Sequence, residues 1–533
     1  MSPSPPILQP LPAALQSALS ARFPDGAPGA ALGIWHRGQS YAGGAGLASL
    51  SAGLSFTPQT RFRACSITKQ LVALLLLQLA AEGALSLDDS PDRYLPQLRS
   101  AGFDPRLTLW QLAQMRSGLP DYWCVAMLTG AQPETPFPAA AGAALIQRLA
   151  LPMFPPGAGT RYSNGNFRIL QWVLEAVSGQ SLADLLQARI FAPLGMTDSC
   201  LGEDTAQPLP DGTRGYRALG PAWEEEHTAI VWSGDAGLLT TLADLLRWEA
   251  AMLGIGDVRL AQSDQLALAR PRPDGSRASY AFGVNAWQSG SRRMQWHSGA
   301  LRGFRMMHLR FPDDGAAVVI LLNRTENPMP HALAFAQLLG LEPAWDRPAP
   351  GVAAGPDFPT GAFFCATLDL VAELAGSAAA PTLNLGMDAQ PLRWTGEREL
   401  VSADGFTQVQ VVAEGLQIQS RSLGFAAHFA ALPAGDARPA LAGRRFISSL
   451  LESVVEFAAD GCTLCFSGPH GRSLTYALRS LGGGLLAFDC PRALDEPPPG
   501  RFHLRIVDDG LRFGCLLASG PALHFVAEKP VQP

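Results

Sequence analysis

The strongest constraint on the fold is a change of sequence pattern around residues 341–360. This stretch, LEPAWDRPAPGVAAGPDFPT, is rich in proline and is typical of a linker. Before it, strand-like and helix-like patterns are mixed, whereas strand-length runs and glycine turns dominate after it. At roughly 150 residues per domain, a chain of 533 residues is long enough for several domains. We therefore expect one large mixed domain at 1–340, followed by β-rich domains.

The first 340 residues are expected to begin and end with strands. Two short strands joined by a turn at Arg37-Gly38 are predicted within 29–46, and two more at 304–311 and 315–322. The helical patterns lie between them, at 66–83, 107–116, 166–178, 181–190 and 241–253. This order predicts an α+β fold on a mostly antiparallel sheet with helices on both sides.

The tail contains an internal repeat. Residues 413–432 resemble residues 508–528, and the start at Gly361-Ala-Phe-Phe resembles the start at Gly443-Arg-Arg-Phe. Such a repeat indicates a duplicated β module, which we expect to form two small antiparallel barrels at 341–440 and 441–533. The alternative is chance similarity between two strand-rich sequences.

Composition excludes several classes of function. The net charge is -6 and no segment is strongly basic, so a nucleic-acid partner is not expected. The longest apolar run, Leu71–Ala81, is too short to cross a bilayer, and the N-terminus lacks the pattern of a secretory signal. The eight cysteines are scattered, and the Cys462-x-x-Cys465 pair has no second pair at zinc spacing. We expect a cytoplasmic protein that needs no metal and has no membrane partner.

The chemistry of the chain is predicted to centre on Ser66-Ile-Thr-Lys69. Residues three apart share one face of a helix, so the Lys69 amine can reach the Ser66 hydroxyl. A neutral lysine there can accept the serine proton during attack on a carbonyl. The alternative is an ordinary lysine on a solvated helix face.

The distribution of basic residues favours the catalytic interpretation. The chain has 38 arginines and only two lysines, Lys69 and Lys529. Arginine stays protonated at working pH, whereas a desolvated lysine can lose its proton. A lysine at this one interior position therefore indicates a group that must deprotonate.

Two further motifs supply partners for this pair. Tyr162-Ser-Asn164 lies in a loop that leads into a helix, where the phenol can relay a proton and the Asn164 amide can hold Lys69 or a carbonyl. His297-Ser-Gly299 lies between two strand-like stretches, and Gly299 is expected to let a substrate backbone approach. The N–H groups of Ser66 and Ala300 are predicted to form an oxyanion hole. The alternatives are a helix-capping turn and a structural histidine.

The three motifs, in this order and spacing, resemble the superfamily of serine β-lactamases, D,D-peptidases and esterases, and its class C branch in particular. Supporting phrases cover 107–122, 167–186, 192–199 and 234–248. The resemblance extends from residue 28 to about 323 and implies a serine nucleophile, an acyl-enzyme and no cofactor.

The length and the repeated tail are similar to a branch of this superfamily that removes N-terminal D-residues. That resemblance implies small peptides or amino-acid amides as substrates, a homodimer, and a specificity loop from the last barrel at 489–500. Penicillin-recognising enzymes usually have lysine at the position of His297, and a mostly neutral histidine attracts a substrate carboxylate far less. An aminopeptidase instead needs an acid for the substrate ammonium. We expect this acid to be Asp495, or else Asp489.

Two other functions remain open at this stage. An esterase, amidase or weak β-lactamase would share the same core residues, and only the tail argues against it. A non-catalytic penicillin-binding sensor is the second alternative, although it would not need a complete set of turnover groups. The sequence does not show a preference for D- over L-residues on physical grounds.

Overall fold

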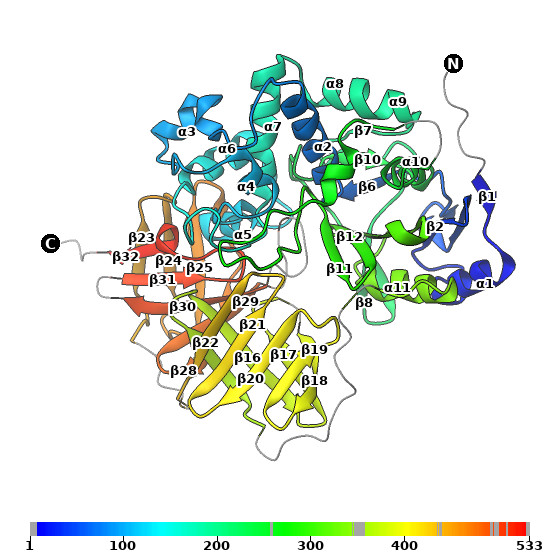
Figure 1. The fold of residues 1–533 in the computed structure, drawn as a ribbon. Coiled ribbons are helices and arrows are strands. Elements are labelled where there is room, and N and C mark those ends of the chain that lie inside the picture. Colours follow the sequence, from blue (N-terminus) through cyan, green and yellow to red (C-terminus); the bar gives the residue numbers. More distant parts are fainter. Residues whose placement is uncertain are drawn as a thin grey trace.

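The structure is a computed structural model, and Figure 1 shows its fold. It describes residues 8–255, 259–343, 345, 358–387, 389–433, 435, 440–490, 494, 500–507 and 510–528. Most of the proline-rich linker predicted at 341–360 lies outside these residues.

A seven-stranded sheet forms the centre of the N-terminal part. Its strand order is β1-β3-β2-β14-β13-β12-β11, and all neighbours are antiparallel except β1 and β3. The strands are β1 (Leu8–Pro10), β2 (Ala30–His36), β3 (Gln39–Ala45), β11 (Asn285–Ser289), β12 (Arg292–Leu301), β13 (Phe304–Phe311) and β14 (Ala316–Leu322). As predicted, β2 and β3 are joined at Arg37-Gly38, where both residues have positive φ.

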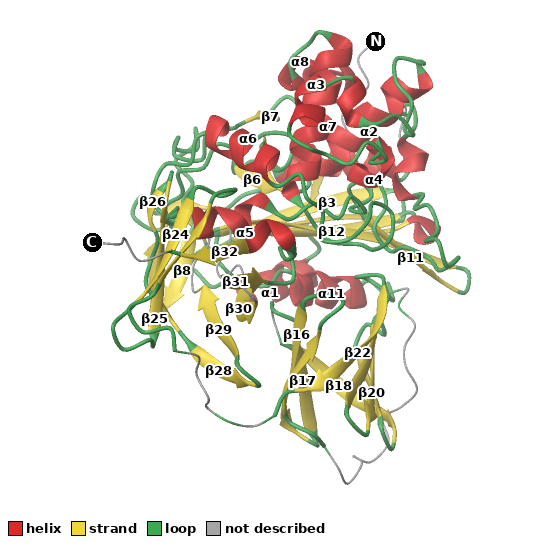
Figure 2. Ribbon diagram, turned by 90° about the vertical axis from the view of Figure 1, so that its left-hand side faces the viewer, coloured by secondary structure: helices red, strands yellow, loops and turns green. Residues whose placement is uncertain are grey.

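Helices cover both faces of this sheet. On β14, Val318 and Ile320 pack with helices α1 (Ala13–Arg22) and α11 (Met329–Leu338) on one face, whereas Val319 and Leu321 face the larger core on the other. This division follows from the alternation of side chains along a strand. Figure 2 shows the larger helical layer above the sheet and α1 and α11 below it. The predicted α+β fold is confirmed.

The larger helical layer contains the remaining α-helices. They are α2 (Thr68–Ala81), α3 (Pro96–Ser100), α4 (Leu109–Ala113), α5 (Tyr122–Ala126), α6 (Ala139–Arg148), α7 (Asn164–Ser178), α8 (Leu182–Leu186), α9 (Ala192–Leu194) and α10 (Leu242–Met252). A small sheet of β6 (Phe62–Cys65), β10 (Leu238–Thr240) and β7 (Cys200–Leu201) lies beside them. The helix predicted at 107–116 is shorter than expected because the chain turns away at Met115, whose φ is 55°.

The first part of the tail is a closed eight-stranded barrel, β15 to β22. Its strands are Gly361–Cys365, Leu370–Ser377, Ala380–Asn384, Gln390–Gly396, Glu399–Ser402, Thr407–Val412, Gly415–Ser420 and Phe425–Ala431. Neighbours in sequence pair with one another, and β15 also pairs with β22, which closes the barrel.

The last part of the tail is a ten-stranded antiparallel sheet with the same general path. Its strands, β23 to β32, are Arg445–Ser448, Ser453–Phe457, Thr463–Gly468, Gly471–Arg472, Tyr476–Ala477, Arg479–Gly482, Leu485–Cys490, Gly500–Val507, Gly510–Gly514 and His524–Ala527. Its first strand again pairs with its last, β23 with β32. Among the described strands, β26 and β27 both pair with β25, and β28 pairs only with β29, so the sheet is not closed as the first barrel is. The second barrel stays a prediction.

The tail packs directly against the helical layer. Thr129, at the end of a short 3-10 helix (Met127–Thr129), bonds to the His470 side chain at 2.7 Å and accepts a bond from its backbone N–H at 3.2 Å. The backbone N–H of Asp121 donates to the Leu517 carbonyl at 2.9 Å. Both contacts flank helix α5, so the tail is anchored beside the segment that carries Asp121. Within the described ranges, no helix is long and apolar enough to cross a membrane.

Candidate functional site

The predicted nucleophile lies at the junction of β6 and α2. Cys65, the last residue of β6, has a φ of 53°, a conformation that a non-glycine residue rarely adopts. This turn places Ser66 at the mouth of helix α2, where its carbonyl accepts the Lys69 backbone N–H at 3.1 Å. Backbone strain of this kind persists only where the surrounding structure fixes it. The local fold therefore holds Ser66 at one defined point.

Lys69 is fully buried and faces Ser66. Its Nζ donates to Ser66 Oγ at 3.2 Å, to Asn164 Oδ1 at 2.8 Å and to the backbone carbonyl of Asp235 at 2.5 Å. The amine also lies 4.9 Å from the centre of the Tyr162 ring. The bonds to Asn164 and Asp235 fix the amine within reach of Ser66 Oγ. At this distance a lysine that has lost one proton can accept the serine proton.

Tyr162 and Asn164 approach from the start of helix α7. Tyr162 Oη donates to Ser66 Oγ at 2.8 Å, so both Tyr162 and Lys69 contact the same oxygen. The backbone N–H and the side-chain amide of Asn164 donate to Asp121 Oδ2 at 2.6 and 2.9 Å. This contact directs the Asn164 Oδ1 atom toward Lys69. Asp121 was not singled out in the sequence, although it lies in the phrase SGLPDY.

A second buried acid, Asp235, holds Lys69 through its backbone carbonyl. The hydroxyl of Tyr122 donates to Asp235 Oδ2 at 2.6 Å, and the Ser233 backbone N–H donates to Asp235 Oδ1 at 2.9 Å. Arg168 Nη1 lies 3.9 Å from Oδ1 in the same buried cluster. Because the carbonyl of Asp235 accepts from Lys69, this cluster positions the lysine. The sequence did not predict this contact, because a backbone oxygen carries no side-chain signature.

His297 lies in β12 with both ring nitrogens bonded inside the protein. Its Nδ1 lies 2.6 Å from the Ser298 carbonyl, which can only accept, so Nδ1 carries the proton. The Tyr280 hydroxyl therefore donates to Nε2, at 3.0 Å. Burial, together with the nearby Lys69 charge, lowers the pKa of His297 to about 3. His297 is therefore neutral at ordinary pH, and it lines the cavity around Ser66.

Gly299 permits a close approach of two strands. A Cβ atom on this residue would lie 2.3 Å from the backbone oxygen of Ala64 in β6, so only a glycine lets β12 approach β6 this closely. This packing places Ala300 beside Ser66, and both residues line the same cavity. Gly299 itself lines another cavity beside β12, and its predicted contact with the substrate backbone stays a prediction.

The cavity around Ser66 has a volume of about 230 Å³ and a largely apolar wall. Asp121 is the one acidic side chain of its lining among the described residues, and burial raises its pKa. The tail contributes two side chains, Met387 and Leu517. The other lining residues are Ser66, Trp123, Cys124, Tyr162, Asn164, Trp232, Ala236, His297, Ser298 and Ala300.

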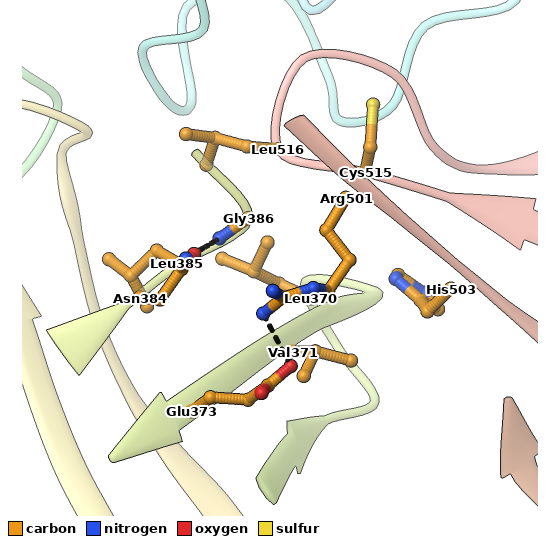
Figure 3. A pocket seen from close by; sticks show the side chains of 10 residues that line it. All are labelled: Leu370, Val371, Glu373, Asn384, Leu385, Gly386, Arg501, His503, Cys515 and Leu516. Carbon is orange, nitrogen blue, oxygen red and sulfur yellow. Dashed lines mark hydrogen bonds and ion pairs between the residues drawn. The ribbon is translucent and has the colours of Figure 1, made fainter. Parts of the chain in front are cut away.

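Of the two acids predicted to bind the substrate amine, Asp489 does not line this cavity. Asp489 lies in β29, is exposed, and pairs with Arg501 at 2.7 Å. Asp495 lies outside the described residues. Arg501 also binds Glu373 of the first barrel at 2.7 Å, and Figure 3 shows this pair across a small pocket from Gly386 and Leu516. Gly386 and Leu516 directly precede Met387 and Leu517, so this pocket adjoins the two loops that reach the Ser66 cavity.

Comparisons with known proteins place this geometry in a family. The Beta-lactamase family model matches residues 17–341. The D-aminopeptidase of Brucella melitensis biotype 1 is 31% identical over 509 residues, which cover 92% of this chain and 95% of that protein. The chain belongs to the D-aminopeptidase family. A second member of the D-aminopeptidase family, from Gluconobacter oxydans, is 31% identical over 523 residues, which cover 94% of this chain and 96% of that protein.

Two solved structures have the same fold as this member of the D-aminopeptidase family. The octameric penicillin-binding protein homologue from Pyrococcus abyssi has a TM-score of 0.53 at 19% identity, and the alignment covers 86% of this chain and 98% of that one. A class C β-lactamase from Rhodobacter sphaeroides has a TM-score of 0.50 at 23% identity, with 62% and 97% of the two chains covered. These two structures show the fold, and the predicted membership of the β-lactamase-like superfamily is confirmed by the family model and the D-aminopeptidase relatives.

Proposed function

We propose that this protein is a D-stereospecific aminopeptidase that releases an N-terminal D-residue, such as D-Ala, from peptides, amides or esters. The observation that carries the proposal is the shared contact of Lys69 and Tyr162 with Ser66 Oγ, which lines a cavity of about 230 Å³. The relatives over nearly the full chain support the choice of substrate.

In the first step, Lys69 acts in its neutral form, in which the Nζ lone pair faces the Ser66 hydroxyl. Ser66 Oγ attacks the substrate carbonyl and Nζ takes the hydroxyl proton. The developing oxyanion is stabilised by the backbone N–H groups of Ser66 and Ala300, which border the cavity. Tyr162 lies 2.8 Å from the attacking oxygen and can pass the proton onward.

In the second step, the bond between the carbonyl carbon and the leaving nitrogen breaks. The amine departs with a proton from Tyr162 or Lys69, and the D-residue remains as an ester on Ser66. Water then attacks this ester, with the same groups accepting its proton, and the free amino acid leaves. No step requires a metal or an organic cofactor.

A neutral His297 favours an amine-ended substrate. With its pKa lowered to about 3, His297 offers no positive charge to a substrate carboxylate. The substrate ammonium needs an acid, and we keep Asp495 as the candidate because Asp489 is paired with Arg501. Asp495→Asn should lower the preference for a free amine over an acetylated one, whereas Asp489→Asn should leave that preference unchanged.

Hydrolysis of D-Ala and L-Ala p-nitroanilides, each with and without N-acetylation, tests the proposal. We expect turnover only of the free D-Ala compound. Equal turnover of the acetylated compound would instead identify an esterase or amidase with the same core site. Acylation without turnover would identify a penicillin-binding sensor.

We further propose that the protein is a cytoplasmic homodimer. All eight cysteines are free thiols, which is typical of a reducing compartment. The dimer rests on the family resemblance, and light scattering of the purified protein tests it. A larger assembly, like the octamer named for the Pyrococcus abyssi homologue, would contradict the dimer.

A further inference from the structure

A second cavity, of about 760 Å³, adjoins the Ser66 cavity at strand β12. The two share Ser298, Ala300 and Met387 in their linings. The second cavity is roughly three times larger, and it lies on the face of the sheet that also carries α11. We call it the outer groove. Its lining includes Asn285, Trp296, Met307, Thr325 and Asn327.

The two cavities meet at an open strand edge. Strand β11 pairs with β12 only as far as Trp296, opposite Asn285. From His297 onward, the outer edge of β12 has no further strand beside it in the part of the chain that the structure describes. An extended peptide can bind such an edge through its own backbone groups. Side chains two apart on a strand share a face, so Ser298 and Ala300 both lie where the two cavities meet.

We propose that the outer groove binds the part of a peptide substrate that follows the scissile bond. This inference rests on the proposed aminopeptidase function. Trp123, Trp232 and Leu517 line the Ser66 cavity, where the first residue of the substrate binds. The rest of the substrate peptide has to leave past Ala300 and Met387, which also line the outer groove.

The outer groove is lined mainly by neutral groups, and its charged residues in the described part of the chain are Arg305 and Glu326. The Arg305 guanidinium can donate to a peptide carbonyl. Asn285, Thr325 and Asn327 offer neutral amide and hydroxyl groups, which can donate or accept. Glu326, which also lines the groove, is paired with Arg324 at 2.5 Å and with His331 at 2.8 Å. Trp296 and Met307 add an apolar wall for a side chain. The substrate class is therefore a D-residue joined to a peptide of at least two further residues.

The length of the substrate tests this inference on the wild-type protein. We compare kcat/KM for D-Ala amide, D-Ala-L-Ala amide and D-Ala-L-Ala-L-Ala amide, with D-Ala p-nitroanilide as the reference. We expect kcat/KM to rise at least tenfold from the first amide to the third. Equal values for the three amides would overturn the outer groove while leaving the aminopeptidase intact. Failure to cleave any of the four compounds would overturn the proposed function itself.

Variants at Asn327, an exposed residue of the groove, test its location. Asn327→Trp should lower the ratio of tripeptide to anilide kcat/KM at least tenfold, because the indole fills the groove. Asn327→Ala leaves the space open and removes only one polar group, so it should lower that ratio much less than Asn327→Trp. Gln180→Trp, at an exposed site before helix α8, is the control for adding a surface indole and should not change the ratio. An unchanged ratio in Asn327→Trp would overturn the proposed path.

Discussion

Lys69 was predictable from the sequence, but most of what holds it in place was not. The near absence of other lysines marked it as special, since arginine serves elsewhere. Its partner Asn164 could also be predicted from the sequence, because the Tyr162-Ser-Asn164 spacing is a local pattern. The carbonyl of Asp235 and the carboxylate of Asp121 were not, because both act through long-range contacts.

Replacing Lys69 with arginine should nearly abolish turnover. Arginine keeps the charge but does not release its proton at working pH, so it cannot serve as the base. We expect kcat for D-Ala p-nitroanilide to fall by about 10²- to 10⁴-fold, the range of a lost general base. A melting curve shows whether the variant is folded. A folded Lys69→Arg protein with wild-type turnover would contradict the assignment.

Asp121→Asn should slow catalysis by loosening Asn164. The carboxylate accepts four N–H groups, two from Asn164 and one each from Trp123 and Cys124. An amide in its place turns a donor toward one of these donors, which costs about 1 to 3 kcal/mol. We expect kcat to fall roughly tenfold or more with little change in KM, because the first effect is on Lys69. A change confined to KM would show that Asp121 acts on the substrate instead.

The neutral state of His297 predicts a pH-dependent stability. Its pKa is about 3 in the folded protein and near 6.5 in an exposed chain, so below pH 6.5 only the unfolded chain binds this proton. The resulting loss of stability begins as the pH falls below 6.5 and continues toward pH 3. Between pH 7 and pH 5 it amounts to about 2 kcal/mol.

Melting curves of the wild type and of His297→Asn at pH 7 and pH 5 measure this contribution. The variant should lose less stability than the wild type over this interval. His227→Asn, at an exposed position, is the control and should follow the wild type. The idea fails if the wild type and His297→Asn lose the same amount.

At the scale of elements, the sequence predicted the strands and long helices better than the short elements that line the Ser66 cavity. Strands β2, β3, β13 and β14 and helices α2, α7 and α10 lie where the periodicity placed them, because strong apolar patterns set each element locally. Helix α5 was missed, since it is only five residues long and fully buried. The packing role of Gly299 was not predicted, because the close approach of β6 and β12 is a tertiary contact.

Gly299→Ala should therefore damage the site through the packing of two strands. Its Cβ would lie 2.3 Å from the Ala64 backbone oxygen, so β12 has to move away from β6. We expect a loss of about 1 to 3 kcal/mol in stability and a kcat lowered at least tenfold, because Ala300 moves relative to Ser66. Gly165→Ala in helix α7 meets only ordinary contacts, at 3.5 Å or more, and is the matched control. It should melt at or above the wild-type temperature.

At the scale of the whole molecule, the tail is part of the Ser66 cavity. The family resemblance implied that a loop of the last barrel would reach the site, at 489–500, and most of that loop lies outside the described residues. The described loops that do so are the ones carrying Met387, from the first barrel, and Leu517, from the last sheet. Deleting the tail would also remove the contacts of Thr129 and Asp121 with it, so truncation would disturb the cavity in several ways. Single substitutions in these loops separate specificity from folding.

Leu517→Ala and Met387→Ala should shift the size of the accepted D-residue. Leu517 is held at the cavity because its carbonyl accepts the Asp121 backbone N–H at 2.9 Å, so shortening its side chain enlarges the cavity without releasing the loop. We expect the ratio of kcat/KM for D-Phe to D-Ala p-nitroanilide to rise at least tenfold in the Leu517 variant and less in the Met387 variant, since Met387 is 40% exposed. Ile506→Ala, at an exposed apolar residue of the same sheet, should leave the ratio unchanged. If all three variants keep the wild-type ratio, the tail supports the site without selecting the substrate.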